Sequence, residues 1–181
     1  MRVPNARGLA PLHGRSVAAV TNHNPVTPAD AAAHFAARLA FETDVSDVHG
    51  ALEAHTPNLV LIDTRSQASW DQGHARGAIH MPKPDMPSRV PAEFPADTQF
   101  VVYCWGPGCN GATNAGLIIS TLGFAVKEMI GGFEYWAREG LPVDKVVTDA
   151  SGARVTIDAT RAVDPLTSPL PAHGARIACD C

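Results

Sequence analysis

Cys104 lies in the sequence context of a reactive thiol. Residues 99–104 form an apolar run typical of a buried strand, and Gly106, Gly108 and Gly111 follow before a helical pattern begins. In α/β sheets, ligands bind outside the carboxyl ends of the strands. A glycine-rich turn that opens a helix can direct backbone N–H groups and the helix dipole at one point, which favours a thiolate. The pattern therefore predicts that Cys104 is a nucleophile rather than only a small buried hydrophobic side chain.

The elements around Cys104 follow from local signals. Thr27 and Pro28 mark a helix start, and Thr43 or Asp44 caps a second helix with Val45 on its apolar face. We expect helices over 28–41, from 44 onward, over 112–122 and over 133–137, and strands over 58–63, 99–104 and 125–130. This alternation predicts an α/β fold, a mostly parallel sheet with helices on both faces.

The domain organisation follows from where these signals begin and end. Residues 1–27 lack periodicity and are predicted to be a loose arm, and residues 28–144 form the domain. Residues 145–181 contain several prolines and are expected to be an irregular extension, although 154–157 could add a short strand. At 181 residues, with 45% hydrophobic residues, the chain suits one globular domain with extensions.

Composition narrows the range of partners. The formal net charge is -4 and no basic run occurs, so nucleic acid and anionic membrane surfaces are not expected to bind. No stretch approaches the roughly 18 apolar residues of a membrane span, and we expect a cytoplasmic protein. Four cysteines in such a chain indicate reactive thiols or a metal site more than a disulfide scaffold.

Several motifs together resemble the rhodanese family of sulfurtransferases, over about residues 45–143. They occur in the family's order, and several motifs that agree are more specific than any one motif alone. The motifs are Leu-Ile-Asp-Thr-Arg (61–65), Trp-Asp-Gln-Gly-His-Ala-Arg-Gly-Ala-Ile-His-Met-Pro (70–82), Val-Val-Tyr-Cys (101–104) and Ile-Gly-Gly-Phe (130–133). The resemblance implies a single rhodanese-like α/β domain with a parallel sheet of five strands. It also implies a cysteine that takes sulfane sulfur from a small donor, thiosulfate or a persulfide, and passes it to cyanide or to a thiol of a small molecule or a protein.

The resemblance assigns roles to individual residues. Cys104 matches the cysteine that forms the persulfide, and Asp63 and Arg65 match an Asp-x-Arg motif, with a structural ion pair favoured over substrate contact. His74 matches a Gly-His motif, with a structural role favoured over that of a catalytic base. The active-site loop, whose backbone amides surround the nucleophile, consists of Trp105, Gly106, Pro107, Gly108, Cys109 and Asn110. No cofactor and no metal ligand are implied.

The loop departs from the family in its charge. Rhodanese loops often carry a basic residue that selects an anionic donor, but none occurs here between Cys104 and Ser120. Efficient use of thiosulfate is therefore not expected, unless Arg65, Arg76 or Arg89 approaches from elsewhere. Related phosphatases need an arginine where this chain has Asn110, so phosphatase chemistry is excluded.

The remaining cysteines leave alternatives open. Cys109 can attack a persulfide on Cys104, releasing sulfide and leaving a disulfide, or it can pack into the helix without reacting. Cys179 and Cys181 are interpreted as exposed thiols, with a relay to Cys104 or a zinc site as less favoured readings. Two other functions therefore stay beside sulfur transfer: a thiol redox module that cycles a Cys104–Cys109 disulfide, and a binding domain that has the fold without turnover.

Overall fold

The computed structural model describes residues 26–165, which belong to two units, residues 1–36 and 37–181. The described part of the first unit is the start of helix α2 (Pro28–Phe41). The Thr27 hydroxyl oxygen accepts a hydrogen bond from the Asp30 N–H at 3.1 Å, so this helix begins as predicted. The predicted N-terminal arm, Cys179 and Cys181 lie outside the described residues. Among the helices of residues 26–165, none combines the length and apolar character needed to cross a bilayer.

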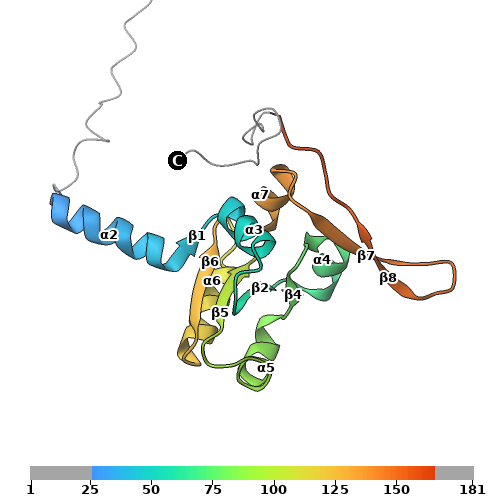
Figure 1. Ribbon diagram of the computed structural model, residues 1–181, viewed down its shortest axis with the longest axis horizontal. Coiled ribbons are helices and arrows are strands. Elements are labelled where there is room, and N and C mark those ends of the chain that lie inside the picture. The colour runs from blue at the N-terminus through green and yellow to red at the C-terminus, as the bar shows by residue number, and fades with distance from the viewer. Residues whose placement is uncertain (1–25, 166–181) are drawn as a thin grey trace, which may run out of the picture. The chain divides into compact units, whose positions relative to one another are not determined.

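A parallel sheet of five strands forms the centre of the second unit (Figure 1). Its order is β1 (Glu42–Thr43), β6 (Ala125–Met129), β5 (Gln99–Tyr103), β2 (Leu59–Asp63) and β4 (Ile79–His80). The two central strands pair in register from Leu59 opposite Gln99 to Asp63 opposite Tyr103. The predicted fold class is therefore confirmed, and the carboxyl ends of β2 and β5 lie side by side.

Helices cover both faces of this sheet. On one face, α3 (Val45–Glu53) and α7 (Gly132–Arg138) pack against Leu61, Val101 and Tyr103. On the other, α5 (Met86–Glu93) and α6 (Gly111–Thr121) pack against Ile62 and Val102. Successive residues of a strand point to opposite faces, so each central strand contributes alternately to both cores.

Short elements that the sequence did not indicate complete the link between β2 and β5. They are α4 (Gln67–Gln72), β3 (His74–Ala75), the 3-10 turn η1 (Lys83–Asp85) and α5. Helix α5 occupies the proline-rich stretch and has Pro91 inside it, yet Met86 and Val90 are fully buried. In a helix this short, a proline removes few backbone hydrogen bonds, and burial of two apolar side chains offsets that loss.

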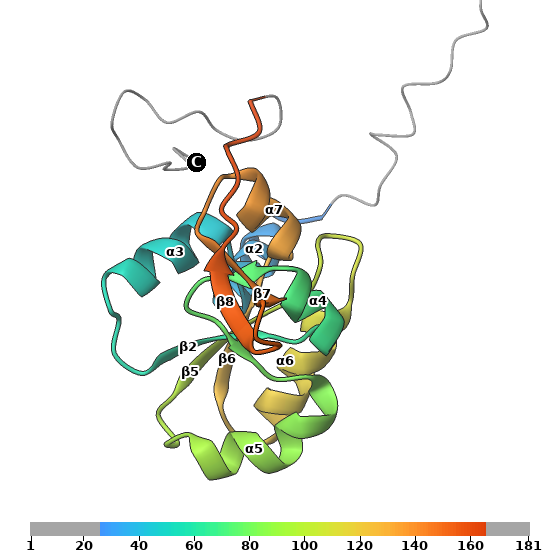
Figure 2. The ribbon, with the colours of Figure 1, turned by 90° about the vertical axis from the view of Figure 1, so that its right-hand side faces the viewer.

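The chain after residue 143 is more regular than the extension that we expected over 145–181, and the short strand considered over 154–157 forms over Arg154–Asp158. β7 (Val143–Thr148) and β8 (Arg154–Asp158) form an antiparallel hairpin that joins β3 in a second sheet, with α4 beside β7 (Figure 2). The Asp149 carboxylate accepts hydrogen bonds from the N–H groups of Ser151 and Ala153 at 2.8 and 3.0 Å, and Gly152 has φ of +85°. This turn chemistry specifies the hairpin.

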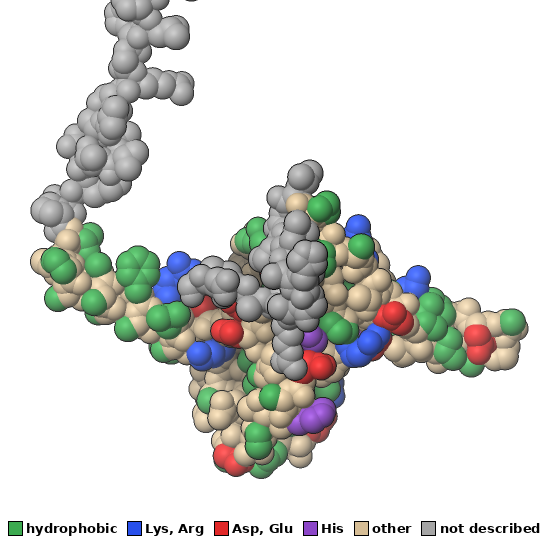
Figure 3. All heavy atoms as spheres, turned by 45° about the horizontal axis from the view of Figure 1, so that its top comes forward, with side chains coloured by type: hydrophobic (Ala, Val, Ile, Leu, Met, Phe, Trp, Pro, Cys, Tyr) green, Lys and Arg blue, Asp and Glu red, His purple; other side chains and the backbone are tan. Residues whose placement is uncertain are grey.

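Ion pairs fasten the base of the hairpin to the domain. Arg76 contacts both Asp144 and Asp158 at 2.7 Å. In Figure 3 acidic and basic side chains lie next to one another where the hairpin leaves the body of the molecule. Since these partners are 68 and 82 residues from Arg76 in sequence, the hairpin is tied to the domain by contacts that local patterns do not reveal.

Candidate functional site

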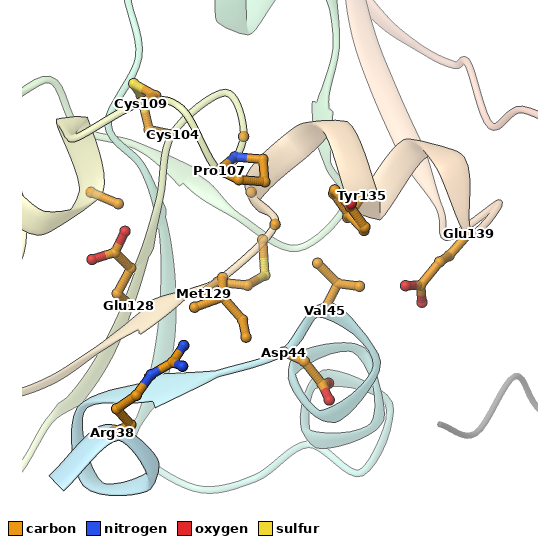
Figure 4. A pocket seen from close by; sticks show the side chains of 15 residues that line it. Arg38, Asp44, Val45, Cys104, Pro107, Cys109, Glu128, Met129, Tyr135 and Glu139 are labelled. Carbon is orange, nitrogen blue, oxygen red and sulfur yellow. A yellow bond between two sulfur atoms is a disulfide. The ribbon is translucent and has the colours of Figure 1, made fainter. Parts of the chain in front are cut away.

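Cys104 follows the last residue of β5, at the carboxyl edge of the sheet, and is 8% exposed. Its sulfur is bonded to the sulfur of Cys109 in a disulfide whose Cα atoms are 6.4 Å apart. Both cysteines line a cavity of about 450 Å³ (Figure 4). The structure thus brings together the predicted nucleophile and the second cysteine of its loop.

The loop after Cys104 folds back so that its end touches its beginning. The Cys109 N–H donates to the Gly106 carbonyl at 3.0 Å, which closes a turn. A Cβ atom on Gly111 would lie 2.5 Å from the Cys104 sulfur and 3.3 Å from the Cys109 sulfur. Only glycine therefore lets the first turn of α6 approach both sulfur atoms. The N–H groups of that turn have no acceptor within the helix.

Helix α7 fixes the other side of the loop through its backbone. The Phe133 N–H donates to the Cys104 carbonyl at 3.0 Å, and the Glu134 N–H donates to the Trp105 carbonyl at 2.8 Å. Gly132 has φ of +58°, and a Cβ there would lie 2.7 Å from the Cys104 carbonyl oxygen. The motif over 130–133 resembles that of the family, and the structure shows what its second glycine does: Gly132 lets α7 pack against the loop.

Asp63 and Arg65 form a buried ion pair beside the loop. The Arg65 Nη2 lies 2.6 Å from the Asp63 carboxylate and donates to the Gly73 carbonyl at 2.6 Å. Tyr103 completes the network, because its hydroxyl donates to Asp63 at 2.7 Å and accepts from the Ala75 N–H at 3.1 Å. Burial, followed by the neighbouring carboxylate, raises the pKa of Tyr103 well above its usual value. Sequence reasoning missed Tyr103, whose position before Cys104 in the motif was its only signal.

The Arg65 guanidinium is also enclosed by aromatic rings. It lies 4.4 Å from the centre of the Trp105 ring and 4.3 Å from that of Phe133, and cation–π contacts of this kind are stronger away from water. Within residues 26–165, its Nη1 is a buried nitrogen without a hydrogen-bond partner. The arginine side chain is 1% exposed, a geometry that fits the favoured structural role. Trp105 remains 41% exposed.

His74 is buried against Trp70 and does not line the cavity. Its Nδ1 lies 2.9 Å from the Trp70 carbonyl, so that nitrogen donates, and the two rings stack with centres 3.4 Å apart. Burial lowers the pKa of His74, because it disfavours the charged form of the ring. This geometry is that of a histidine satisfied by its own neighbours.

The charged side chains that line the cavity are Arg38, Asp44, Glu128 and Glu139 (Figure 4). Arg38, from α2, donates two hydrogen bonds to Glu42, at 2.9 and 2.7 Å. Burial, followed by the nearby Asp44 carboxylate, raises the pKa of Glu139. Sequence reasoning missed these residues, since their distance along the chain gives no hint of a shared cavity.

The arginines considered as substitutes for a basic loop residue are engaged elsewhere. Arg65 is paired with Asp63, Arg76 with Asp144 and Asp158, and Arg89 with Glu93. None of these three arginines lines the cavity. Across the described range, no three His, Cys, Asp or Glu side chains are grouped as metal ligands.

Comparison with known proteins agrees with this geometry. A protein named Sulfurtransferase from Allochromatium vinosum is 33% identical over 90 residues, which cover 50% of this chain and 82% of that protein. The HTH-type transcriptional regulator Rv0324 of Mycobacterium tuberculosis is 36% identical over 87 residues, or 48% of this chain. The chain matches only 38% of the length of that regulator.

Solved structures and family comparison extend this result. The crystal structure of the BH2092 protein from Bacillus halodurans aligns with a TM-score of 0.62 and 33% identity, over 66% of this chain and 87% of that one. Residues 45–139 match the family described as Rhodanese-like domain. That range holds Cys104, its loop and the Asp63–Arg65–Tyr103 network, so this chain belongs to the rhodanese-like domain family.

Proposed function

We propose that this protein is a sulfurtransferase that carries sulfane sulfur as a persulfide on Cys104. The Cys104 thiolate attacks the sulfane sulfur of a donor, whose remainder leaves with the bonding electron pair. An acceptor thiolate or cyanide then attacks the outer sulfur and releases the Cys104 thiolate. The observation that carries this proposal is the position of Cys104, at the carboxyl end of a central strand and facing a cavity of about 450 Å³.

The surroundings of Cys104 support a negatively charged sulfur in the reduced protein. Gly111 begins α6 next to the Cys104 sulfur, and the first N–H groups of a helix and its dipole favour an anion. Helix α7 holds the carbonyls of Cys104 and Trp105 by hydrogen bonds. In this proposal the amides of Trp105, Gly106, Gly108 and Asn110 stabilise the thiolate and then the persulfide. Pro107 has no N–H, and the Cys109 N–H, which we expected to take part, donates to the Gly106 carbonyl instead.

The cavity charges favour an organic persulfide over thiosulfate as the donor. Asp44, Glu128 and Glu139 line the cavity, and Arg38, its cation among the described residues, is bound to Glu42. A doubly charged anion would meet like charges without a free cation to compensate them. We therefore infer a neutral or cationic donor and a thiol acceptor.

The test is to mix the reduced protein with thiosulfate or with a neutral organic persulfide and locate the added sulfur by peptide mass spectrometry. We expect the persulfide to load Cys104 at least about tenfold faster than thiosulfate does, and Cys104→Ser to remove the adduct. The double variant Cys179→Ser, Cys181→Ser is the control that should load normally. The proposal would be overturned if neither donor added sulfur to Cys104 and no sulfide was released.

A second candidate function is a thiol redox module, which the Cys104–Cys109 disulfide favours. In the cytoplasm, where we place the protein, such a disulfide would be reduced by cellular dithiols. Mild peroxide should then form it without any sulfur donor, and a dithiol should reverse it. If the oxidised form does not appear under peroxide, this candidate is rejected.

A further inference from the structure

The sulfur atoms of Cys104 and Cys109 are directly bonded, although the loop that joins them could have held the second cysteine elsewhere. Resting on the proposed function, we infer that Cys109 is a resolving nucleophile, which discharges the Cys104 persulfide as hydrogen sulfide. The protein would then be a sulfide-releasing persulfide reductase that needs a dithiol, in addition to a transferase to external acceptors.

The geometry of the loop places Cys109 for this step. The hydrogen bond from the Cys109 N–H to the Gly106 carbonyl turns the chain back at 3.0 Å, and the missing side chain at Gly111 leaves room for both sulfur atoms. Cys104 belongs to the core between the sheet and α6, and the partly buried Cys109 packs against it. Meanwhile α7 fixes the Cys104 carbonyl from the other side. Cys109 is therefore held against Cys104 rather than pointed into solvent.

The contact also decides which sulfur would be attacked. In a persulfide, the Cys104 Sγ is the inner sulfur and the transferred atom is the outer one. Since Cys109 bonds directly to the Cys104 Sγ in the structure, attack at the inner sulfur needs no other arrangement of the loop. Attack at the outer sulfur would instead move that atom to Cys109 and form no disulfide.

The step balances in atoms and electrons. The Cys109 thiol gives its proton to the outer sulfur of the anionic persulfide, and its own sulfur forms a bond to the Cys104 Sγ. The bond from that Sγ to the outer sulfur breaks, and the outer sulfur leaves with the electron pair as hydrosulfide. The sulfane sulfur is reduced by two electrons, and the two cysteines are oxidised to the disulfide. A small dithiol then reduces the disulfide by thiol exchange and becomes a disulfide itself.

The cavity fits such a product. Cys104 and Cys109 both line it, so the outer sulfur of a persulfide has space beside the two sulfur atoms. Its carboxylates, Asp44, Glu128 and Glu139, disfavour retention of an anion. Hydrosulfide is therefore expected to leave rather than to re-attack the disulfide.

The experiment is a single turnover without an acceptor. The full-length reduced protein is loaded with a neutral organic persulfide and freed of excess donor. Released sulfide is then measured against time, and disulfides are located by peptide mass spectrometry. Wild type should release about one sulfide per loaded chain and form the Cys104–Cys109 disulfide, while Cys109→Ser should keep its persulfide and release sulfide at least about tenfold more slowly. Cyanide added afterwards measures the sulfur that remained bound.

Matched variants keep the outcomes distinct. Cys109→Ala repeats the test with a different side chain, circular dichroism checks that both variants fold, and the double variant Cys179→Ser, Cys181→Ser should behave as wild type. Equal retention of persulfide by wild type and Cys109→Ser would overturn this inference and leave the transferase proposal standing. Sulfur found on Cys109, or a disulfide from Cys104 to another cysteine, would also overturn it. If neither protein takes up sulfur or releases sulfide, the transferase proposal itself fails.

Discussion

Two groups of family-motif residues lie at the carboxyl ends of the neighbouring strands β2 and β5, and they differ in their surroundings. One group is the Asp63–Arg65–Tyr103 network, and the other is Cys104 with its loop. Asp63 and Tyr103 are opposite one another in the pairing of β2 with β5, and both are fully buried. Cys104 is the next residue along the chain but packs on the α6 face and lines a cavity. A one-residue step along a strand reverses the direction of the side chain, and here it separates a buried polar network from a loop that lines a cavity.

The two groups are also held by different forces. Charged and polar side chains satisfy one another in the Asp63–Arg65–Tyr103 network. The Cys104 loop is held by backbone hydrogen bonds from α7 and by glycines that permit close approach. From this difference we infer that the buried motif residues serve stability. The proposed sulfur chemistry falls to the Cys104 loop, whose side chains contribute little to the stability of the fold.

Removing one partner of the buried network should have the largest effect on stability. Asp63→Asn leaves the Arg65 charge uncompensated among the rings of Trp105 and Phe133. Loss of one member of a buried pair destabilises by about 3–5 kcal/mol. Urea unfolding of the reduced protein measures this. A change below about 1 kcal/mol would mean that Asp63 is not a structural partner and would break the comparison.

A smaller loss is expected where α7 touches the loop. Gly132→Ala adds a Cβ 2.7 Å from the Cys104 carbonyl oxygen at a φ of +58° and should destabilise by about 1–3 kcal/mol while slowing sulfur loading of Cys104. Gly152→Ala is the matched control, because it also has positive φ, at +85°, but no atom within 4 Å of the added Cβ. Equal unfolding free energies and loading rates in the two variants would show that the contact with the loop is unimportant.

The burial of His74 should make stability depend on pH. Its pKa in the folded protein is lowered, so the unfolded chain binds more protons as the pH falls below the ordinary histidine value of about 6.5. The free energy of unfolding should therefore decrease below that pH, by at most about 1.4 kcal/mol per pH unit from this group. Urea unfolding at several pH values measures the slope.

The asparagine side chain of His74→Asn can keep a donor to the Trp70 carbonyl but does not titrate. The free energy of unfolding of this variant should therefore fall less steeply with decreasing pH than that of wild type. The control is His55→Asn, at an exposed position with positive φ that asparagine tolerates. Wild-type and His74→Asn curves that run parallel through the acid range would contradict the prediction.

The smallest effect on stability is expected at Cys104, the proposed nucleophile. Cys104→Ala, compared with wild type under reducing conditions, should change the free energy of unfolding by less than about 1 kcal/mol and yet remove all sulfur loading. Loading by mass spectrometry and unfolding in urea are measured on the same sample. A loss of stability as large as that of Asp63→Asn would remove the distinction between the two groups.

Most of the fold around the site could be predicted from local sequence. The helix over 28–41 and the helix capped by Asp44 both form, because caps and apolar periodicity act within a few residues. The strands β2, β5 and β6 and the helix after Cys104 also lie where the apolar runs indicated. Helix α5 was not predicted, since its prolines oppose the local helical pattern and burial of Met86 and Val90 outweighs them.

By itself, the sequence determined the position of Cys104 between a strand and a glycine loop. The ion pair of Asp63 with Arg65 was favoured only through the family resemblance. The tertiary structure decided which side chains face them: the Tyr103 hydroxyl reaches Asp63 across 40 residues, and α7 supplies its N–H groups to the Cys104 loop. It also decided that Arg38, Glu128 and Glu139 share the cavity. The physical reason is range, because caps, turns and periodicity act between near neighbours, whereas buried charge and cavity walls are set only when distant segments pack.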